Sequence, residues 1–454
     1  MAVEEKQAVS IEEMVVKARR AMAEIHDYSQ EQVDALTKVI AKAIFDNAEP
    51  LAKLAQAETG LGRVDHKINK NIGMATNIYS SLVGKKSVGV LREIPEAGLI
   101  EIAHPMGVVG SVTPTTNPTI TPLGNGLMAI KGRNAMIVSP HPRSKKTTTE
   151  TLRLMREALV SVAAPADLLQ VIEEPNIELS QELMKKSDVI VATGGPGLVK
   201  SAYSSGKPAF GVGPGNVQAI LDRDFDVATA AELTVVGRSF DNGIVCACQQ
   251  SLFYPAEKEA ELFTALENQK TAIFTDEAEV SRLREIIFPA GRTNPDMIGQ
   301  YPEVIAKAAG LLVPKDTEII AVKVAGIGSA ELFNKEKMCP VLVMKSYEAF
   351  EDVVEYAKAN LLLEGAGHSA GLFSNNQEHI VYTGLTLPVS RVVVNQPTID
   401  AGGSPTNGLN PTSSLGCGSW GNNIISENLT YRHLINVQRV ALPLASQVVD
   451  NLWE

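Results

Sequence analysis

From residue 107 onward, short apolar runs alternate with helical segments, and this alternation restricts the possible folds more than any other feature of the sequence. Four runs that end in turn-forming residues lie at 107–114, 134–140, 168–174 and 188–195. Segments with helical spacing, such as 147–162 and 178–186, lie between them. Because parallel strands need a long, usually helical crossover, this order predicts a parallel sheet covered by helices. Ligands of such sheets bind beyond the carboxyl ends of the strands, where we expect the chemistry.

The chain is longer than one hydrophobic core usually serves, with 454 residues. A helical layer precedes residue 80, and a two-strand hairpin is predicted for 86–103 around Pro95-Glu96-Ala97-Gly98. We expect one α/β domain over 1–225 that carries this hairpin and a second over 226–395. Residues 396–454 should then return to the first domain.

Composition excludes several classes of partner. Hydrophobic residues make up 44% of the chain and charged residues 20%, which is typical of a globular protein. The formal net charge of −11 argues against a nucleic acid or an anionic membrane as partner. No stretch approaches the roughly 20 apolar residues of a membrane span, and the acidic start is unlike a secretory signal. The four cysteines lack metal-ligand spacing, so we expect reduced thiols, no metal site and a cytoplasmic location.

Two motifs point to a phosphate site and a nucleophile. The turn Ala192-Thr193-Gly194-Gly195-Pro196-Gly197 joins an apolar strand to a helix, so its backbone N–H groups could face a pyrophosphate, although ordinary turns have the same composition. Cys246 follows the polar loop Ser239-Phe240-Asp241-Asn242-Gly243, a setting that favours a thiolate. The alternative for Cys246 is a buried core residue, and that is the interpretation for Cys248, Cys339 and Cys417.

Two further residues have a possible catalytic role. Asn117 lies in TPTTNP at the end of the first run, where a side-chain amide can stabilise an oxyanion, but Asn-Pro is also a common turn. His368 lies in the glycine-containing stretch EGAGHSAG, where an imidazole can act as acid or base or simply be hydrogen-bonded structure.

Together these motifs resemble the aldehyde dehydrogenase superfamily over nearly the whole chain, and most closely its coenzyme-A-acylating branch, in particular acylating succinate-semialdehyde dehydrogenases and the aldehyde dehydrogenase half of bifunctional aldehyde-alcohol dehydrogenases. The stretches that carry the resemblance are TPTTNP (113–118), SPHPRSKK (139–146), ATGGPG (192–197), SSGKPAFGVGPGN (204–216), FDNGIVCACQQS (240–251), KEKMCPV (335–341), EGAGHSAG (364–371) and LGCGSWGNNIISEN (415–428).

The resemblance implies two Rossmann-like α/β domains with a small β oligomerisation hairpin, the first domain binding a dinucleotide and the second carrying the cysteine loop. It implies that Cys246 is the nucleophile, that Asn117 and the Cys246 N–H form an oxyanion hole, and that His368 takes the thiol proton of coenzyme A. The cofactor, NAD or NADP, is expected to be bound by Thr113, Pro114, Ser139, His141, Arg143, Thr193, Gly194, Gly195, Gly213 and Glu336.

Departures from the family pattern refine the expected reaction. Hydrolytic members have a glutamate that activates water where this chain has Gly211, so the acyl group should pass to coenzyme A instead of water.

The favoured substrate is succinate semialdehyde, whose carboxylate Arg391 or Arg143 could bind. Acetaldehyde, propionaldehyde and sulfoacetaldehyde are the alternatives, and a hydrolytic enzyme or a binding protein without activity is the less favoured reading. Lys145 and Lys146 join Arg143 as candidates for a cofactor phosphate.

The expected assembly is a homodimer or a dimer of dimers, in which the 86–103 hairpin packs against residues 424–440 of a neighbour. Gln249 departs from the glutamate of close relatives, and the sequence assigns it no effect.

Overall fold

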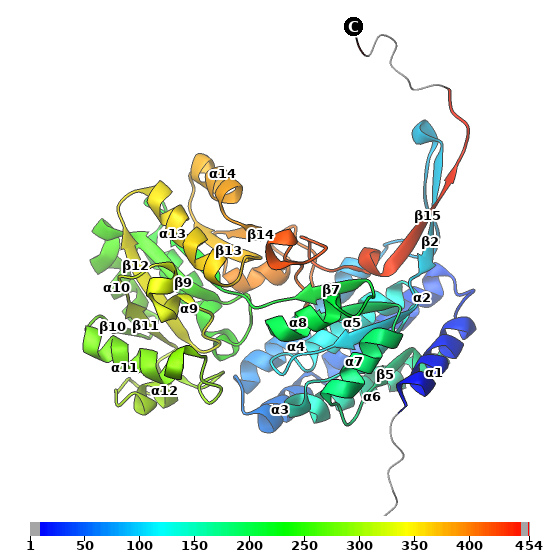
Figure 1. The fold of residues 1–454 in the computed structure, drawn as a ribbon, viewed down its shortest axis with the longest axis horizontal. Helices are drawn as coiled ribbons and strands as arrows, with labels where there is room; N and C mark the ends of the chain where they lie inside the picture. Colours follow the sequence, from blue (N-terminus) through cyan, green and yellow to red (C-terminus); the bar gives the residue numbers. More distant parts are fainter. Residues whose placement is uncertain (1–9, 446–452, 454) are drawn as a thin grey trace, which may run out of the picture.

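Parallel strand pairing organises both halves of the protein, as a computed structural model of residues 10–445 and Trp453 shows (Figure 1). The first half is built on a five-stranded sheet in the order β5-β4-β3-β6-β7, with every pair parallel. Its strands are β3 (Val108–Val112), β4 (Ala135–Ser139), β5 (Leu169–Val171), β6 (Val189–Thr193) and β7 (Ala209–Val212). The four apolar runs therefore form β3 to β6, and the chain reverses its direction across the sheet between β3 and β6. A ligand is expected at that reversal.

Helices before and between these strands bury the sheet on both faces. The N-terminal layer comprises α1 (Ile11–Glu24), α2 (Gln30–Asp46), α3 (Ala48–Thr59) and α4 (Val64–Leu82), and the crossovers are α5 (Ile120–Lys131), α6 (Lys145–Ser161), α7 (Ile177–Lys186) and α8 (Pro196–Tyr203). The α2 helix begins with a reciprocal capping box between Ser29 and Gln32. All residues of α5 are buried, because this helix packs against α2, α4 and β4.

The second half contains a seven-stranded parallel sheet in the order β10-β11-β12-β9-β8-β13-β14. Its strands are β8 (Val217–Leu221), β9 (Gln249–Pro255), β10 (Thr271–Phe274), β11 (Ile319–Lys323), β12 (Val341–Tyr347), β13 (Gly367–Phe373) and β14 (Val389–Val394). Its helices are α9 (Val227–Ser239), α10 (Glu259–Asn268), α11 (Glu277–Ile287), α12 (Pro302–Ala308), α13 (Phe350–Leu363) and α14 (Gln377–Thr386). The chain changes sheet between Val212 and Val217, so β8 already belongs to the second sheet although it precedes the expected boundary at 225.

A three-stranded antiparallel arm projects from the first half (Figure 1). The predicted hairpin forms β1 (Gly89–Ile94) and β2 (Leu99–Pro105), and β15 (Ile435–Ala441) of the same chain pairs with β2. The edge of the hairpin at β2 is thus occupied by this chain's own β15, and packing of the hairpin against the C-terminal stretch of a neighbour stays a prediction. None of the helices among the described residues has the length and apolar character that crossing a bilayer requires.

Candidate active site

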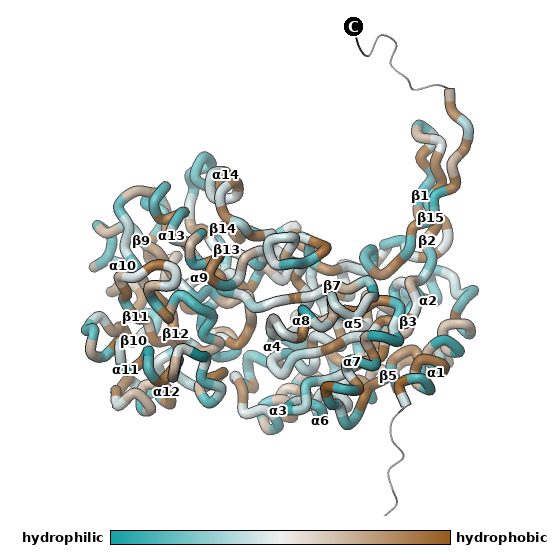
Figure 2. Tube along the Cα trace, viewed as in Figure 1, coloured by the Kyte–Doolittle hydropathy of each residue, from teal (hydrophilic) through white to brown (hydrophobic). Residues whose placement is uncertain are grey.

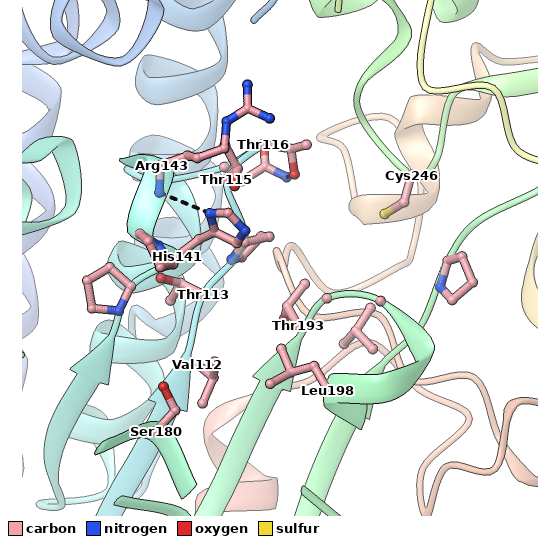
Figure 3. Close-up of a pocket in the computed structure, with 18 of the residues that line it drawn as sticks. Val112, Thr113, Thr115, Thr116, His141, Arg143, Ser180, Thr193, Leu198 and Cys246 are labelled. Carbon is pink, nitrogen blue, oxygen red and sulfur yellow. Dashed lines mark hydrogen bonds between the residues drawn. The ribbon is translucent and has the colours of Figure 1, made fainter. Parts of the chain in front are cut away.

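A cavity of about 650 Å³ lies beyond the carboxyl ends of the five-stranded sheet and extends to the cysteine loop. The residues that follow β3, β4 and β6 line one side of it, and Ile244, Cys246, Glu336 and Met338 line the side toward the second half. Figure 3 shows Cys246 across the cavity from His141 and Arg143, with its sulfur turned toward the side on which they lie. The cavity therefore occupies the place where the strand order of the first sheet reverses.

Most of the predicted site residues meet at this cavity. Its lining includes Thr113, Pro114, Asn117, His141, Arg143, Thr193, Gly194, Gly195, Gly213, Cys246 and Glu336. Ser139 and His368 do not line it. Ser139 is the last residue of β4 and is buried, with its hydroxyl 2.7 Å from that of Ser180, which does line the cavity. Ser139 thus supports a cavity wall from behind.

The backbone before Cys246 has an unusual conformation that brings the thiol to the surface of the cavity. Asp241, Asn242 and Gly243 have successive φ values of 50°, 52° and 71°, in the left-handed region. Hydrogen bonds fix this turn, since the Asn242 amide donates to the carbonyl of Gly299 at 3.0 Å. On the other side, a Cβ at Gly215 would overlap the carbonyl oxygen of Cys246. At Gly215 the loop therefore approaches Cys246 as closely as only glycine permits.

Cys246 is partly exposed, whereas Cys248, Cys339 and Cys417 are buried. Burial of its sulfur raises the pKa of the Cys246 thiol to about 12, and the nearby Glu336 raises it further. The expectation that the loop favours a thiolate is therefore wrong for the protein without bound ligands. Desolvation disfavours the anion more strongly than any neighbouring group favours it.

Glu336 lines the cavity together with Cys246 and contacts the glycine loop. Its carboxylate accepts the N–H of Gly215 at 3.2 Å, and its own N–H donates to the carboxylate of Glu364 at 2.8 Å. Burial, reinforced by Glu364, raises the pKa of Glu336 to about 8. Glu336 is therefore mostly neutral at pH 7, and it is the one Asp or Glu among the described residues that line the cavity.

Asn117 presents a side-chain amide to the cavity. Its Oδ1 accepts a hydrogen bond from the Nζ of Lys70 at 2.9 Å. The N–H of Cys246 makes no hydrogen bond to any other described residue. These two groups are the donors that the expected oxyanion hole requires.

The other polar groups of the cavity fit a dinucleotide. The hydroxyls of Thr113 and Thr193 are buried and have no hydrogen-bond partner among the described residues. They lie at the ends of β3 and β6, on the two sides of the reversal in strand order. Gly194 and Gly195 precede the first turn of α8, and a Cβ at Gly195 would meet no atom within 4 Å. This opening, with unsatisfied donors and a helix N-terminus, suits a pyrophosphate group.

Arg143 is the one Lys or Arg among the described residues that line the cavity. It follows β4, and its N–H donates to the ring of His141 at 3.1 Å (Figure 3). Lys145 is paired with Glu174 instead. The N–H groups of Lys146 and Thr147 donate to the carboxylate of Glu58, which caps the start of α6.

His368 lies in β13 and is fully buried, away from the cavity lining. Neither ring nitrogen has a hydrogen-bond partner among the described residues. Burial, with a smaller effect of Arg391, lowers the pKa of His368 to about 3, so the imidazole is neutral. A buried imidazole without partners is rare in proteins and suits a group that completes its bonding with a ligand.

The guanidinium of Arg391 is occupied by structural hydrogen bonds and is not available as the substrate-binding cation that the sequence suggested. Its guanidinium donates to Asn428 at 2.8 Å and to the carbonyls of His368 and Gly416 at 2.8 and 2.6 Å. It thereby ties the loop before β15 to β13, and it does not line the cavity.

The two departures from the family pattern lie outside the cavity. Gly211 is in β7, where a Cβ would meet Val199 at 2.7 Å and Tyr203 at 2.8 Å. Gln249 is buried at the start of β9, and its Oε1 accepts the hydroxyl of Thr398 at 2.7 Å. Gln249 therefore joins β9 to the segment after β14, which gives it a structural role.

Sequence reasoning missed a group of charged residues beneath Asn117. Lys67 and Lys70 of α4 both contact the carboxylate of Asp241, and all three side chains are buried. Their signal in the sequence was the spacing of two lysines one turn apart on an amphipathic helix. That spacing became informative only once the tertiary structure showed what the lysines contact.

Several known proteins are similar to this chain in sequence and in structure. Residues 1–279 match the aldehyde dehydrogenase family. The chain is 48% identical to a succinate-semialdehyde dehydrogenase (acetylating) of Clostridium kluyveri, over 95% of each chain. It is 38% identical to the bifunctional aldehyde-alcohol dehydrogenase of Escherichia coli over 94% of this chain and 49% of that one. An acetylating aldehyde dehydrogenase of Geobacillus thermoglucosidasius has a similar structure, with a TM-score of 0.94, 36% identity and 97% of each chain covered.

Proposed function

We propose that this chain, which belongs to the aldehyde dehydrogenase family, interconverts succinate semialdehyde and succinyl-coenzyme A. It is an acylating aldehyde dehydrogenase that uses NAD or NADP and coenzyme A. The observation that supports acyl transfer to coenzyme A is the composition of the cavity around Cys246. Glu336 is its one carboxyl group among the described residues, and with a pKa near 8 only a minor fraction of it is ionised at pH 7 and able to take a proton from water.

Residues of the chain account for the nucleophile and for stabilisation of the oxyanion. In the proposed reaction, the Cys246 thiol first loses its proton to solvent, and the resulting thiolate adds to the aldehyde carbon and forms a thiohemiacetal. Its oxyanion accepts hydrogen bonds from the Asn117 amide and the Cys246 N–H. Thr113, Thr193 and the start of α8 would hold the dinucleotide, which would supply the hydride acceptor.

Once the hydride is lost, a thioester joins the acyl group to Cys246. The thiol of coenzyme A attacks that thioester, the bond to the Cys246 sulfur breaks, and acyl-coenzyme A leaves. We propose that the neutral His368 accepts the proton of the incoming thiol. The support for this role is that neither ring nitrogen of His368 has a hydrogen-bond partner among the described residues, so one of them is free to accept a proton.

The test separates acyl transfer from hydrolysis. Enzyme mixed with aldehyde and oxidised cofactor, without coenzyme A, should release about one equivalent of reduced cofactor and then nearly stop. Coenzyme A should restore steady turnover. Sustained release of free carboxylic acid without coenzyme A would contradict the proposal.

The substrate is proposed on the similarity to the Clostridium kluyveri enzyme, whose name states succinate semialdehyde. Because Arg391 is committed to the fold, Arg143 remains the cation in the cavity that could meet a carboxylate or a cofactor phosphate. We propose the phosphate, and hence a preference for NADP. An NAD site usually has a carboxylate for the ribose 2′-hydroxyl, whereas an arginine suits the 2′-phosphate. Kinetics with succinyl-, acetyl- and propionyl-coenzyme A would decide the substrate.

A homodimer or a dimer of dimers in the cytoplasm is likewise proposed. The arm supports the assembly, because Val90, Val440, Leu442 and Leu444 are 37–52% exposed on it. Figure 2 shows apolar segments along the arm where it leaves the body of the protein. Such a surface is usually covered by another protein surface. A monomeric mass at micromolar concentration would contradict this proposal.

A further inference from the structure

Two parts of the chain that are distant in sequence meet beneath the cavity at one buried carboxylate. Asp241, which is fully buried, precedes Cys246 by five residues in the cysteine loop. Its Oδ2 accepts hydrogen bonds from the Nζ atoms of Lys67 at 2.9 Å and Lys70 at 2.5 Å. Its Oδ1 accepts the N–H of Arg63 at 2.9 Å. Both carboxylate oxygens are therefore used, and the cysteine loop is bound to the start of α4.

The two lysines share this partner but differ in one contact. Lys67 is 3% exposed and Lys70 is 8% exposed, and they lie one helical turn apart on α4. Lys70 alone continues to the cavity, where its Nζ donates to Asn117 Oδ1 at 2.9 Å and approaches the carbonyl of Thr116 at 3.5 Å. Lys67 ends at Asp241.

The chemistry of the ammonium group decides how the Asn117 side chain is oriented. An ammonium group has only donors, so it must face the carbonyl oxygen of the amide and not its NH2 group. The NH2 group is thereby directed away from Lys70, and its one recorded contact is a long one, 3.5 Å to the hydroxyl of Thr116. In the opposite orientation the amide would present an acceptor to a developing oxyanion and would repel it.

We propose that Lys70 is a positioning residue for the oxyanion site: anchored on Asp241, it holds the Asn117 amide with its NH2 group toward the aldehyde oxygen. This inference rests on the proposed function, because it assigns Asn117 the oxyanion. The same contacts couple the oxyanion donor to the loop of the nucleophile. Asp241 of the cysteine loop binds Lys70, and Lys70 binds Asn117. The positions of Asn117 and Cys246 are therefore fixed relative to each other.

The decisive comparison is between Lys70→Met and Lys67→Met. Each variant removes one buried ammonium from Asp241, so both should lower the melting temperature to a similar degree. Only Lys70→Met removes the contact with Asn117, and it should lower kcat about 10- to 100-fold with little change in KM, a part of what losing an oxyanion donor costs. Lys67→Met should keep kcat within about threefold.

A double substitution distinguishes positioning from general damage. In an Asn117→Ala background, Lys70→Met should change kcat by less than about threefold, because the group that Lys70 positions is already absent. An equal loss in both backgrounds would overturn the proposal, as would equal kcat values for Lys70→Met and wild type. Absence of coenzyme-A-dependent turnover in the wild-type enzyme would instead contradict the proposed function.

A second variant leaves both lysines in place, which covers the case in which Lys70→Met does not fold. Asn117→Asp keeps an acceptor for Lys70 and removes the NH2 group. It should melt no lower than Asn117→Ala and lose kcat at least to the same extent, about 10²- to 10³-fold or more, because a carboxylate repels the oxyanion. If Asn117→Asp retained kcat within about threefold of wild type, the NH2 group would not be the donor and the proposal would fail.

Discussion

Cys246 should react as an unusually weak acid in the protein without bound cofactor. Its thiol pKa of about 12 is three units above the ordinary value of 9.0. At pH 8 the thiolate fraction is then on the order of 10³-fold below that of an ordinary cysteine, since each pKa unit is a factor of ten. Because only the thiolate is alkylated, iodoacetamide should modify Cys246 slowly, and the rate should rise with pH without a plateau up to about pH 10.

Glu336 should also affect how the alkylation rate of Cys246 depends on pH. Its carboxyl group, with a pKa near 8, is neutral below that pH and becomes an anion beside the sulfur above it. The alkylation rate of the wild type should therefore rise less than tenfold per pH unit around pH 8, whereas Glu336→Gln should rise by the full factor of about ten and react faster at pH 9.

Mass spectrometry of the modified peptide measures these rates, and Cys246→Ala reports any reaction at the buried cysteines. A plateau below pH 9 in the wild-type protein would refute the reasoning, because it would show that neighbouring groups outweigh desolvation. An unchanged profile in Glu336→Gln would refute the electrostatic contribution of that residue alone.

Further predictions concern stability, the second half-reaction and the cofactor. The pKa of Glu336 rises from an ordinary 4.5 to about 8 on folding, so the stability that its protonated form contributes is lost as the pH rises from 4.5 to 8. In calorimetry, Glu336→Gln should therefore melt at least about 2 °C higher than wild type at pH 9, but not at pH 4. His368→Ala should keep the single-turnover burst of reduced cofactor but lower coenzyme-A-dependent turnover about 10²-fold in stopped-flow assays, and loss of the burst would contradict the assignment. Arg143→Ala should raise KM for NADP about tenfold or more and for NAD less than about threefold, and an equal effect on both would place Arg143 elsewhere than at the 2′-phosphate.

Short-range patterns determined most of the architecture. The apolar runs from 107 to 195 became β3 to β6 within one to three residues, and the hairpin around Pro95 became β1 and β2. The strands β7, β8, β10 and β11 were among those not foreseen. The first two flank the glycine-containing stretch 213–216, where side-chain alternation is interrupted. Local patterning predicts such elements well because burial of one face follows directly from the order of residues.

The position of the site also followed from sequence, through the rule that ligands lie beyond the carboxyl ends of parallel strands. The chemical state of its residues did not. The raised pKa of Cys246, the internal role of Arg391 and the contact of Lys70 with Asn117 depend on groups that are distant along the chain. Desolvation and hydrogen bonding act through space, so only the tertiary structure decides which charges are buried together and which side chains remain free to act.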